Sequence, residues 1–304
     1  MKLLVVCSKN SGKIAPFIFE QGESLVCLGV EVDYYPIVGK GLLGYWKNRK
    51  LLLQKIKSFE PDIIHAHYGL SGLLANTQRR IPVVTTYHGS DINIPGLFFL
   101  SRMNMLLSAH NIFVSEKNRY KSGLKTNFSL MPCGVDTVLF VPRSKSESRK
   151  LLGLEEEKKL VLFSSAFDIS VKNSALALSA VAQLHQVQLI ELKNYTREQV
   201  TLLMNASDVA LMTSFTEGSP QFIKEAMACN CPVVSVAVGD VPYVIENTNG
   251  CFIAAYDPND LAEKLKMALD FGTRTDGRKR IIELGWSTEK VAEKLLNLYR
   301  EILH

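Results

Sequence analysis

The chain alternates short apolar runs with helix-type patterns from one end to the other. Eleven runs have the length and composition of buried strands: 3–7, 31–37, 62–67, 83–88, 111–115, 128–132, 159–165, 187–192, 208–214, 232–238 and 250–254. Repeated strand–helix units form parallel sheets with helices on both faces, so the pattern predicts an α/β protein. Ligands of such sheets bind beyond the carboxyl ends of the strands, where polar or Gly-containing turns follow several of these runs.

The length of 304 residues suits two domains of ordinary size. A Pro- and charge-rich stretch near 141–150 is the natural boundary. We therefore expect two Rossmann-like domains, over 1–141 and 142–286, facing each other across a central cleft. The segment 287–304 reads as one amphipathic helix with Ser287 as its N-cap, packing back toward the N-terminal domain.

Composition is that of a soluble globular protein, with 47% hydrophobic and 21% charged residues. No apolar run approaches the length of a membrane span, and the start "MKLLVVCSKN" turns polar too early for a signal peptide. The six cysteines form no disulfide or zinc framework, so we expect free thiols in a reducing cytoplasm. Residues 1–141 hold 16 Lys/Arg against 9 Asp/Glu, a net charge of +7, whereas the remainder carries −2. The N-terminal half should therefore meet anionic partners.

The segment "TEGSPQFIKEA" (216–226) places two acids, Glu217 and Glu225, around a predicted helix start. Pro220 suits a first helical turn, and Ser219 is a favoured N-cap type. The unpaired N–H groups of such a helix favour a phosphate. Carboxylates on either side of it could accept hydrogen bonds from hydroxyls. A nucleotide sugar has this arrangement of groups, although two surface acids at an ordinary helix start would look similar.

These residues resemble the retaining glycosyltransferases of the GT-B fold, family four. The resemblance runs through most of the chain and is most specific over "SFTEGSPQFIKEAMACNCPVVSVAVGDVPYVI" (214–245). Supporting stretches are "PDIIHAH" (61–67), "PVVTTYHGSD" (82–91) and "MPCGVDTVLF" (131–140), together with Lys172. The details look like enzymes of bacterial surface polysaccharide assembly.

The resemblance implies a role for each matching residue. Glu217 would bind hydroxyls of the donor sugar, and Glu225 those of the ribose. Lys172 would neutralise the diphosphate, and His88 would lie near the anomeric centre. The remaining donor-binding positions are Gly12, Gly218, Ser219, Pro220, Leu192 and Lys193. The implied reaction is transfer of a hexosyl-type sugar, with retention of configuration, from a UDP or GDP sugar to a glycan or lipid-linked acceptor.

Two departures from the family pattern stand out. "SSAFDISVK" offers no arginine before Lys172, and one βα unit of the C-terminal domain is missing before "VQLIELKNY". The alternatives are a nucleotide-sugar 2-epimerase of the same fold and a non-catalytic nucleotide-sugar-binding subunit. We expect no metal, because no D-x-D occurs, and we also expect no cofactor and no nucleic-acid partner. Stabilisation of the leaving group then falls to Lys172 and helix N–H groups.

Other candidates lie in the N-terminal half. His67 shares a strand face with His65 and suggests either a site residue or structural packing, and Asp91 could cap a turn. The stretch Lys40–Lys57 mixes cations with Leu42, Leu43, Tyr45 and Trp46. It suggests peripheral contact with the inner face of the cytoplasmic membrane, or else an amphipathic helix with a solvated basic face.

Overall fold

The computed structural model describes residues 1–304, which form two compact units. Unit 1 comprises Met1–Gly134 and Thr288–His304, and unit 2 comprises Val135–Ser287. The division falls earlier than the expected boundary after residue 141, because Val135 and Phe140 are buried in the core of unit 2.

Unit 1 is built on a parallel sheet of six strands in the order β2-β1-β3-β4-β5-β6. The strands are β1 Lys2–Ser8, β2 Glu31–Ile37, β3 Ile63–His67, β4 Val83–Tyr87, β5 His110–Phe113 and β6 Phe128–Leu130. Strands β3 and β4 are buried along their whole length. This burial explains their continuous apolar character in place of an alternating one.

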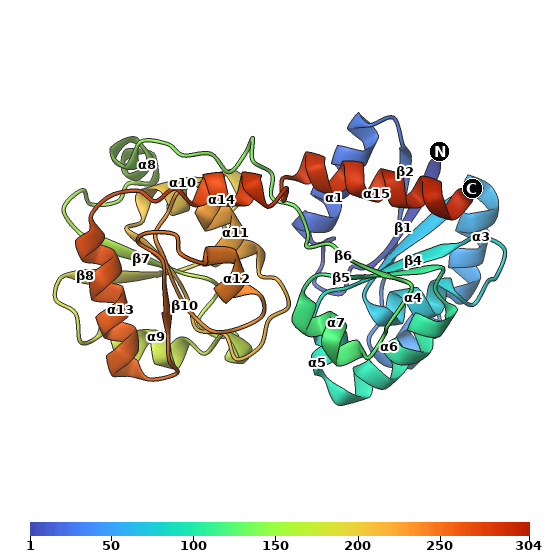
Figure 1. The fold of residues 1–304 in the computed structure, drawn as a ribbon, viewed down its shortest axis with the longest axis horizontal. Coiled ribbons are helices and arrows are strands. Elements are labelled where there is room, and N and C mark those ends of the chain that lie inside the picture. Colours follow the sequence, from blue (N-terminus) through green and yellow to red (C-terminus); the bar gives the residue numbers. More distant parts are fainter. The chain divides into compact units, whose positions relative to one another are not determined.

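Helices cover both faces of this sheet, as Figure 1 shows. Helices α1 (Pro16–Cys27) and α15 (Thr288–Leu303) pack on the face that Leu3 and Val5 present. The opposite face, with Leu4 and Val6, receives α2 (Gly41–Trp46), α3 (Arg49–Phe59) and α4 (Gly69–Ala75). Helix α6 (Pro95–Leu107) packs against α4. The short helices α5 (Ser90–Asn93) and α7 (Glu116–Ser122) follow β4 and β5.

The Lys40–Lys57 stretch forms two helices, α2 and α3, and not one continuous amphipathic helix. Asn48 stands between them, and its side-chain amide donates to the carbonyl of Gly44 (2.8 Å) and to that of Val38 (3.0 Å). Such side-chain bonds offer the backbone an alternative to a continuous helical ladder. The chain consequently turns after α2, and α3 packs separately through Leu52.

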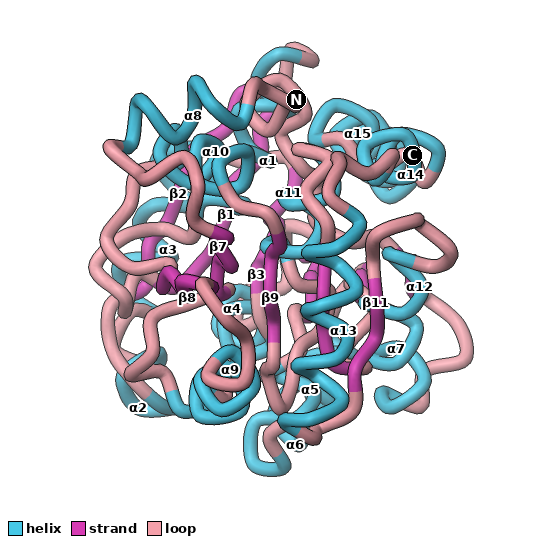
Figure 2. Tube along the Cα trace, turned by 90° about the vertical axis from the view of Figure 1, so that its left-hand side faces the viewer, coloured by secondary structure: helices cyan, strands magenta, loops and turns pink.

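Unit 2 is built on a five-stranded parallel sheet in the order β11-β10-β9-β7-β8. Its strands are β7 Lys159–Phe163, β8 Val187–Glu191, β9 Val209–Met212, β10 Val233–Val236 and β11 Phe252–Ala254. Helices α9 (Ser174–Val181) and α13 (Pro258–Phe271) cover one face, and Figure 2 shows α13 running beside β9 and β11. The other face packs against α10 (Arg197–Ala206), α11 (Gln221–Ala228), α12 (Val241–Ile245) and α14 (Gly277–Glu283), and α8 (Lys145–Leu152) lies on α10. The expected α/β architecture is confirmed, since each of the eleven apolar runs contains one strand.

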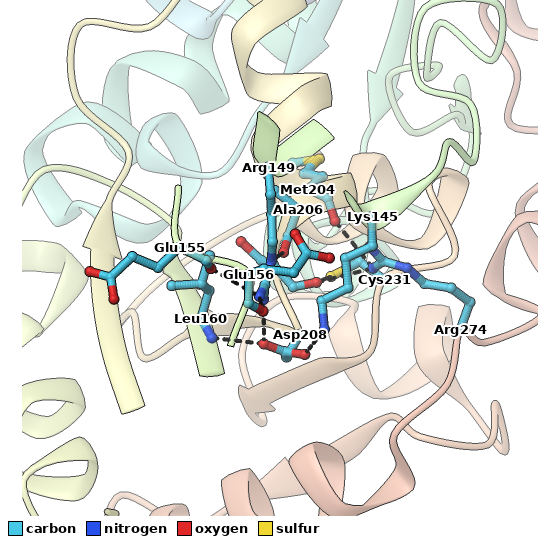
Figure 3. A network of polar contacts seen from close by, with 11 residues as sticks. Lys145, Arg149, Glu155, Glu156, Leu160, Met204, Ala206, Asp208, Cys231 and Arg274 are labelled. Carbon is cyan, nitrogen blue, oxygen red and sulfur yellow. Dashed lines mark hydrogen bonds and ion pairs between the residues drawn. The ribbon is translucent and has the colours of Figure 1, made fainter. Parts of the chain in front are cut away.

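A buried arginine anchors the amino-terminal edge of this second sheet (Figure 3). Arg149 is 1% exposed, and its guanidinium donates to Asp208 (2.9 Å) and to the carbonyl of Ala206 (2.9 Å). Asp208 also pairs with Lys145 and accepts from the amide of Leu160 (2.7 Å). This network fixes the entry into β7 and β9, at the edge opposite to the turns that carry the predicted site residues.

Candidate functional site

The turn carrying Glu217 leaves the carboxyl end of β9, the central strand of the unit 2 sheet. The turn after the neighbouring strand β7 ends in a 3₁₀ turn, Ser170–Lys172. Two contacts join these turns: the hydroxyl of Thr213 donates to the carbonyl of Lys172 (2.9 Å), and the amide of Phe215 donates to that of Val171 (3.0 Å). Residues far apart in sequence thus meet where parallel sheets bind ligands.

Lys172 and Glu217 form an ion pair, with 2.6 Å between Nζ and Oε1. Both side chains are partly exposed, at 25% and 17%. The pair holds a cation and a carboxylate side by side at a surface that a ligand can reach. Each could exchange its partner for a ligand group, the lysine for an anion and the glutamate for a hydroxyl.

Helix α11 begins one residue later than expected. Pro220 occupies the N-cap position, with φ −70° and ψ 121°, so Ser219 is not the N-cap. No side-chain oxygen caps this helix. Its first N–H groups therefore remain suited to an external anion beside the Gly218–Pro220 backbone.

A second turn closes against the first. Gly239 follows β10 and adopts φ +57°, a left-handed conformation that favours glycine. A Cβ atom at this position would lie 2.6 Å from the carbonyl oxygen of Gly218. The backbone of the Glu217–Gly218 turn is therefore held by direct contact with the Gly239 turn.

Asp240 and Lys224 support this pair of turns from inside the unit. Lys224 is fully buried, and its ammonium lies 5.8 Å from the centre of the Trp286 ring. Burial raises the pKa of the Asp240 carboxyl to about 6, against the nearby Lys224 charge and the Ser219 hydroxyl, which lower it. Neither residue stands out in the sequence, because a lysine at a core position of an amphipathic helix gives no distinct signal.

Glu225 lies in the second turn of α11 and is 4% exposed. Arg197 at the start of α10 pairs with it, with 2.7 Å between Nη2 and Oε1. The same guanidinium stacks 4.6 Å above the ring centre of Phe140. Arg197 was missed from the sequence, where it appears only as a cation in the first turn of a helix.

Leu192 and Lys193 follow β8, the edge strand next to β7. The amide of Leu192 donates to the carbonyl of Ser165 (3.0 Å), which places it beside the turn that leads to Lys172. Lys193 is exposed and pairs with Asp168 (2.9 Å). Unit 2 thus collects all of its predicted site residues in the turns and first helical turns at the carboxyl edge of its sheet.

Three stacked imidazoles form the second group, in unit 1. The ring centres of His65 and His67 are 4.6 Å apart, and those of His67 and His88 are 5.2 Å apart. His67 Nδ1 lies 2.9 Å from His88 Nε2, and His65 is held between Tyr299 (2.5 Å) and Thr86 (2.7 Å). Burial lowers the pKa of His65 to about 3, and it also lowers the pKa of His67. Both buried rings are therefore neutral near pH 7.

Asp91 fixes the backbone around His88. Its carboxylate accepts from the amides of Gly89 (2.8 Å), His88 (3.3 Å) and Gly69 (3.3 Å). Burial raises the pKa of Asp91 to about 6, although these three amides lower it. Asp91 thus caps the turn after β4 and also ties this turn to the start of α4.

Gly12 lies in the loop after β1, with φ +90° and open space where a Cβ would stand. Ser8 at the end of β1 and the loop residues Asn10 and Ser11 share the wall of one pocket with Asp91. No group of three or more His, Cys, Asp or Glu side chains is arranged to hold a metal ion. No helix is both long and apolar enough to cross a membrane.

Two family models match the chain. Residues 3–139 match the model described as Glycosyltransferase Family 4, and residues 173–270 match the one described as Glycosyl transferases group 1. Among similar curated proteins is the D-inositol 3-phosphate glycosyltransferase of Mycolicibacterium smegmatis, 24% identical over 69% of this chain and 60% of that protein. Another is the putative teichuronic acid biosynthesis glycosyltransferase TuaC of Bacillus subtilis, 26% identical over 71% of this chain and 63% of that protein. The chain thus spans about three fifths of the length of these relatives.

Solved structures share the fold over the whole chain. Sucrose-phosphate synthase from Thermosynechococcus elongatus superposes with a TM-score of 0.84 at 18% identity, covering 99% of both chains. Anabaena Alr3699/HepE in complex with UDP-glucose superposes with a TM-score of 0.78 at 16% identity, covering 99% of this chain and 100% of the other. At these identities the similarity establishes the fold alone.

Proposed function

The chain belongs to the family 4, group 1 glycosyltransferases, and from this premise we propose that it moves a hexosyl-type sugar from a UDP or GDP sugar to an acceptor hydroxyl. The Lys172–Glu217 ion pair carries the proposal. It puts a cation and a hydroxyl acceptor beside the uncapped start of α11, where a diphosphate and the sugar attached to it would both find partners.

Each donor group has a residue suited to it. Lys172 and the first N–H groups of α11 would take the diphosphate. Glu217 would take donor-sugar hydroxyls, and the Gly218–Pro220 backbone would face the sugar and the phosphate. Glu225 would take the ribose hydroxyls, held in place by Arg197. Leu192 and Lys193 would lie near the base.

Donor binding would exchange partners within the ion pair. In the structure Lys172 and Glu217 satisfy each other. When the donor enters, the ammonium turns to the diphosphate oxygens and the carboxylate accepts from sugar hydroxyls. Charge that develops on the leaving diphosphate is then met by a cation and by helix N–H groups that are already in place.

We propose that configuration is retained by front-face attack of the acceptor hydroxyl, without a metal ion. His88 would lie near the anomeric centre, with its ring held by His67 and its backbone held by Asp91. The Gly12 loop would approach the phosphates. The acceptor would be a glycan or lipid-linked molecule, and transfer would take place at the inner face of the cytoplasmic membrane through the Lys40–Lys57 region.

The proposal is tested by nucleotide binding followed by transfer. Thermal shift with UDP, GDP and their common sugars should raise the melting temperature for at least one series, because a ligand of the folded state stabilises it. Lys172→Ala should then lower kcat about 100- to 1000-fold with that donor. Lys266→Ala is the matched control, since Lys266 forms an exposed ion pair with Asp270 on helix α13.

Two results would count against this function. One is the absence of any shift with all nucleotides and sugars. The other is a Lys172→Ala enzyme as active as Lys266→Ala. Binding without donor hydrolysis or transfer would instead identify a non-catalytic nucleotide-sugar-binding subunit, and epimer formation without an acceptor would identify a 2-epimerase.

A further inference from the structure

Unit 1 contains a pocket of mixed polar and apolar lining, here named the polar pocket, at the carboxyl ends of its strands. The pocket has a volume of about 360 Å³, and its polar lining includes Ser8, Asn10, Ser11, Tyr68, Ser90 and Asp91. Hydroxyl, amide and carboxylate groups beside a tyrosine ring suit the hydroxyl groups of a sugar. In the proposed reaction this edge of unit 1 serves the acceptor.

An apolar groove adjoins this pocket. It has a volume of about 650 Å³ and lies between α2, α4 and α6. Its lining is dominated by Leu42, Leu43, Trp46, Leu73, Met103 and Leu107. Tyr45 and Leu70 line both the groove and the polar pocket, so the two spaces share a wall.

The groove side chains of α2 are exposed, although α2 itself is firmly held. Leu43 is 80% exposed and Trp46 is 57% exposed. Asn10, which lines the polar pocket, exchanges two 2.8 Å hydrogen bonds with the backbone of Gly39, directly before α2. Gly39 and Gly44 touch so closely that a Cβ on either would lie 2.7 Å from the other's backbone. The chain therefore fixes a short helix whose apolar side it does not bury, and the contacts that fix it begin in the polar pocket.

Positive charge predominates in the segment that carries α2 and α3. Residues 34–59 contain six Lys/Arg and no Asp or Glu. Arg49 lies 5.7 Å from the ring centre of Trp46, and Arg79 donates to Asn76 (3.3 Å) and to the carbonyl of Leu107 (2.9 Å) at the groove margin. The groove thus suits a hydrocarbon chain that ends in an anionic group.

We propose that the α2–α4–α6 groove binds the hydrocarbon chain of a lipid-linked acceptor, in which an isoprenyl or acyl chain carries a sugar through a phosphate group and the sugar occupies the polar pocket. Naming the ligand an acceptor rests on the proposed function. The binding site itself is inferred from the polar pocket and the adjoining groove, and binding can be tested without sugar transfer. It selects the lipid-linked class over a free glycan.

Trp46 is a built-in probe of the groove. The chain has two tryptophans, and Trp286 is 8% exposed in the core of unit 2. Titration with farnesyl diphosphate should shift Trp46 emission to shorter wavelength and saturate. Affinity should fall at least about tenfold for isopentenyl diphosphate, because each buried methylene group adds to the transfer free energy. The signal should vanish in Trp46→Phe.

Two variants test where the hydrocarbon chain of the ligand binds. Leu43→Gln should lower the affinity for farnesyl diphosphate about tenfold, because the ligand would lose an apolar contact with the side chain at this position. Leu151→Gln is the matched control, because Leu151 is 71% exposed on α8 of unit 2 and should leave the affinity unchanged. Equal affinities for farnesyl diphosphate, isopentenyl diphosphate and inorganic pyrophosphate would overturn the inference.

Vesicles of phosphatidylglycerol without acceptor provide the second arm. If the chain of an acceptor fills the groove, farnesyl diphosphate should reduce any vesicle binding that depends on Leu43. Vesicle binding that needs Leu43 but ignores farnesyl diphosphate would make the groove a bilayer-docking surface and refute the inference. If the protein binds nucleotides but not farnesyl diphosphate, this inference alone is refuted. If it binds farnesyl diphosphate but no nucleotide, the proposed function alone is refuted.

Discussion

Replacing Gly239 with alanine tests whether the Gly239 turn holds the Glu217–Gly218 turn in place. Two costs can be worked out from the structure. The φ of +57° costs a side chain about 1–2 kcal/mol in the left-handed region. In addition, the new Cβ would start 2.6 Å from the carbonyl oxygen of Gly218, and ordinary contact requires a separation of at least 3.4 Å. One of the two turns must therefore move by most of an ångström.

Gly153→Ala separates the two costs. Gly153 has φ +65° and nothing within 4 Å of the position that a Cβ would take. It lies in the same unit, at the end of α8. This control should lose about 1 kcal/mol of unfolding free energy and keep full nucleotide affinity.

Gly239→Ala should lose about 2–4 kcal/mol, the conformational cost plus that of the close contact. Displacement of the Glu217–Gly218 turn should also lower kcat by about 100-fold, since small shifts at a reacting centre are costly. Urea unfolding gives the first quantity, and donor hydrolysis or transfer gives the second. Equal stability and equal activity in the two variants would refute the idea that contact between the turns positions Glu217.

Three further predictions follow from buried charges. Burial raises the pKa of Asp91 from 3.8 to about 6, so the folded state favours the neutral acid, and the resulting stability is complete below about pH 4 and is lost as the pH rises through 6. Over this range the unfolding free energy of the wild type should fall by about 3 kcal/mol relative to that of Asp91→Asn. Equal pH dependence of the two unfolding free energies would contradict this prediction. Arg197→Gln should cost about 2 kcal/mol of stability, measured by urea unfolding, and about tenfold in nucleotide affinity, measured by calorimetry. Adding Glu225→Gln should restore the stability but not the affinity. Arg149→Met should cost about 3 kcal/mol by leaving Asp208 with one cation, yet leave nucleotide affinity unchanged; reduced affinity would contradict the separation of this network from the site.

Most strands were readable from the sequence because they are apolar and buried over most of their length, as β1, β7 and β9 are. The strand β3 is an example, since "DIIHAH" predicted it and the structure buries every residue from Ile63 to His67. The same reasoning could not foresee the break between α2 and α3. That break depends on where the side chain of Asn48 finds acceptors, and apolar periodicity carries no information about such contacts.

The candidate site was predictable in its parts but not in its pairings. Lys172 and Glu217 were each identified, yet nothing in the spacing says that they touch, because contact requires β7 and β9 to be neighbours. Strand order is set by packing across the whole sheet. Arg197 illustrates the same limit, since its partner Glu225 lies on another helix and the pair forms only through the packing of α10 against α11.

The two carboxylates that first indicated a nucleotide-sugar site have different surroundings, and these separate their roles. Glu225 is 4% exposed and pinned by an arginine that is itself stacked on Phe140, so its position is fixed before any ligand arrives. Glu217 lies on a turn and is 17% exposed, and its partner Lys172 borders the space where a diphosphate would bind. A fixed acceptor suits the ribose, which does not change during transfer, and an acceptor with an exchangeable cation suits the sugar that leaves. We propose that the reaction rests on stabilisation of the departing diphosphate, and not on a covalent glycosyl-enzyme, because the proposed role of both carboxylates is to hold hydroxyl groups.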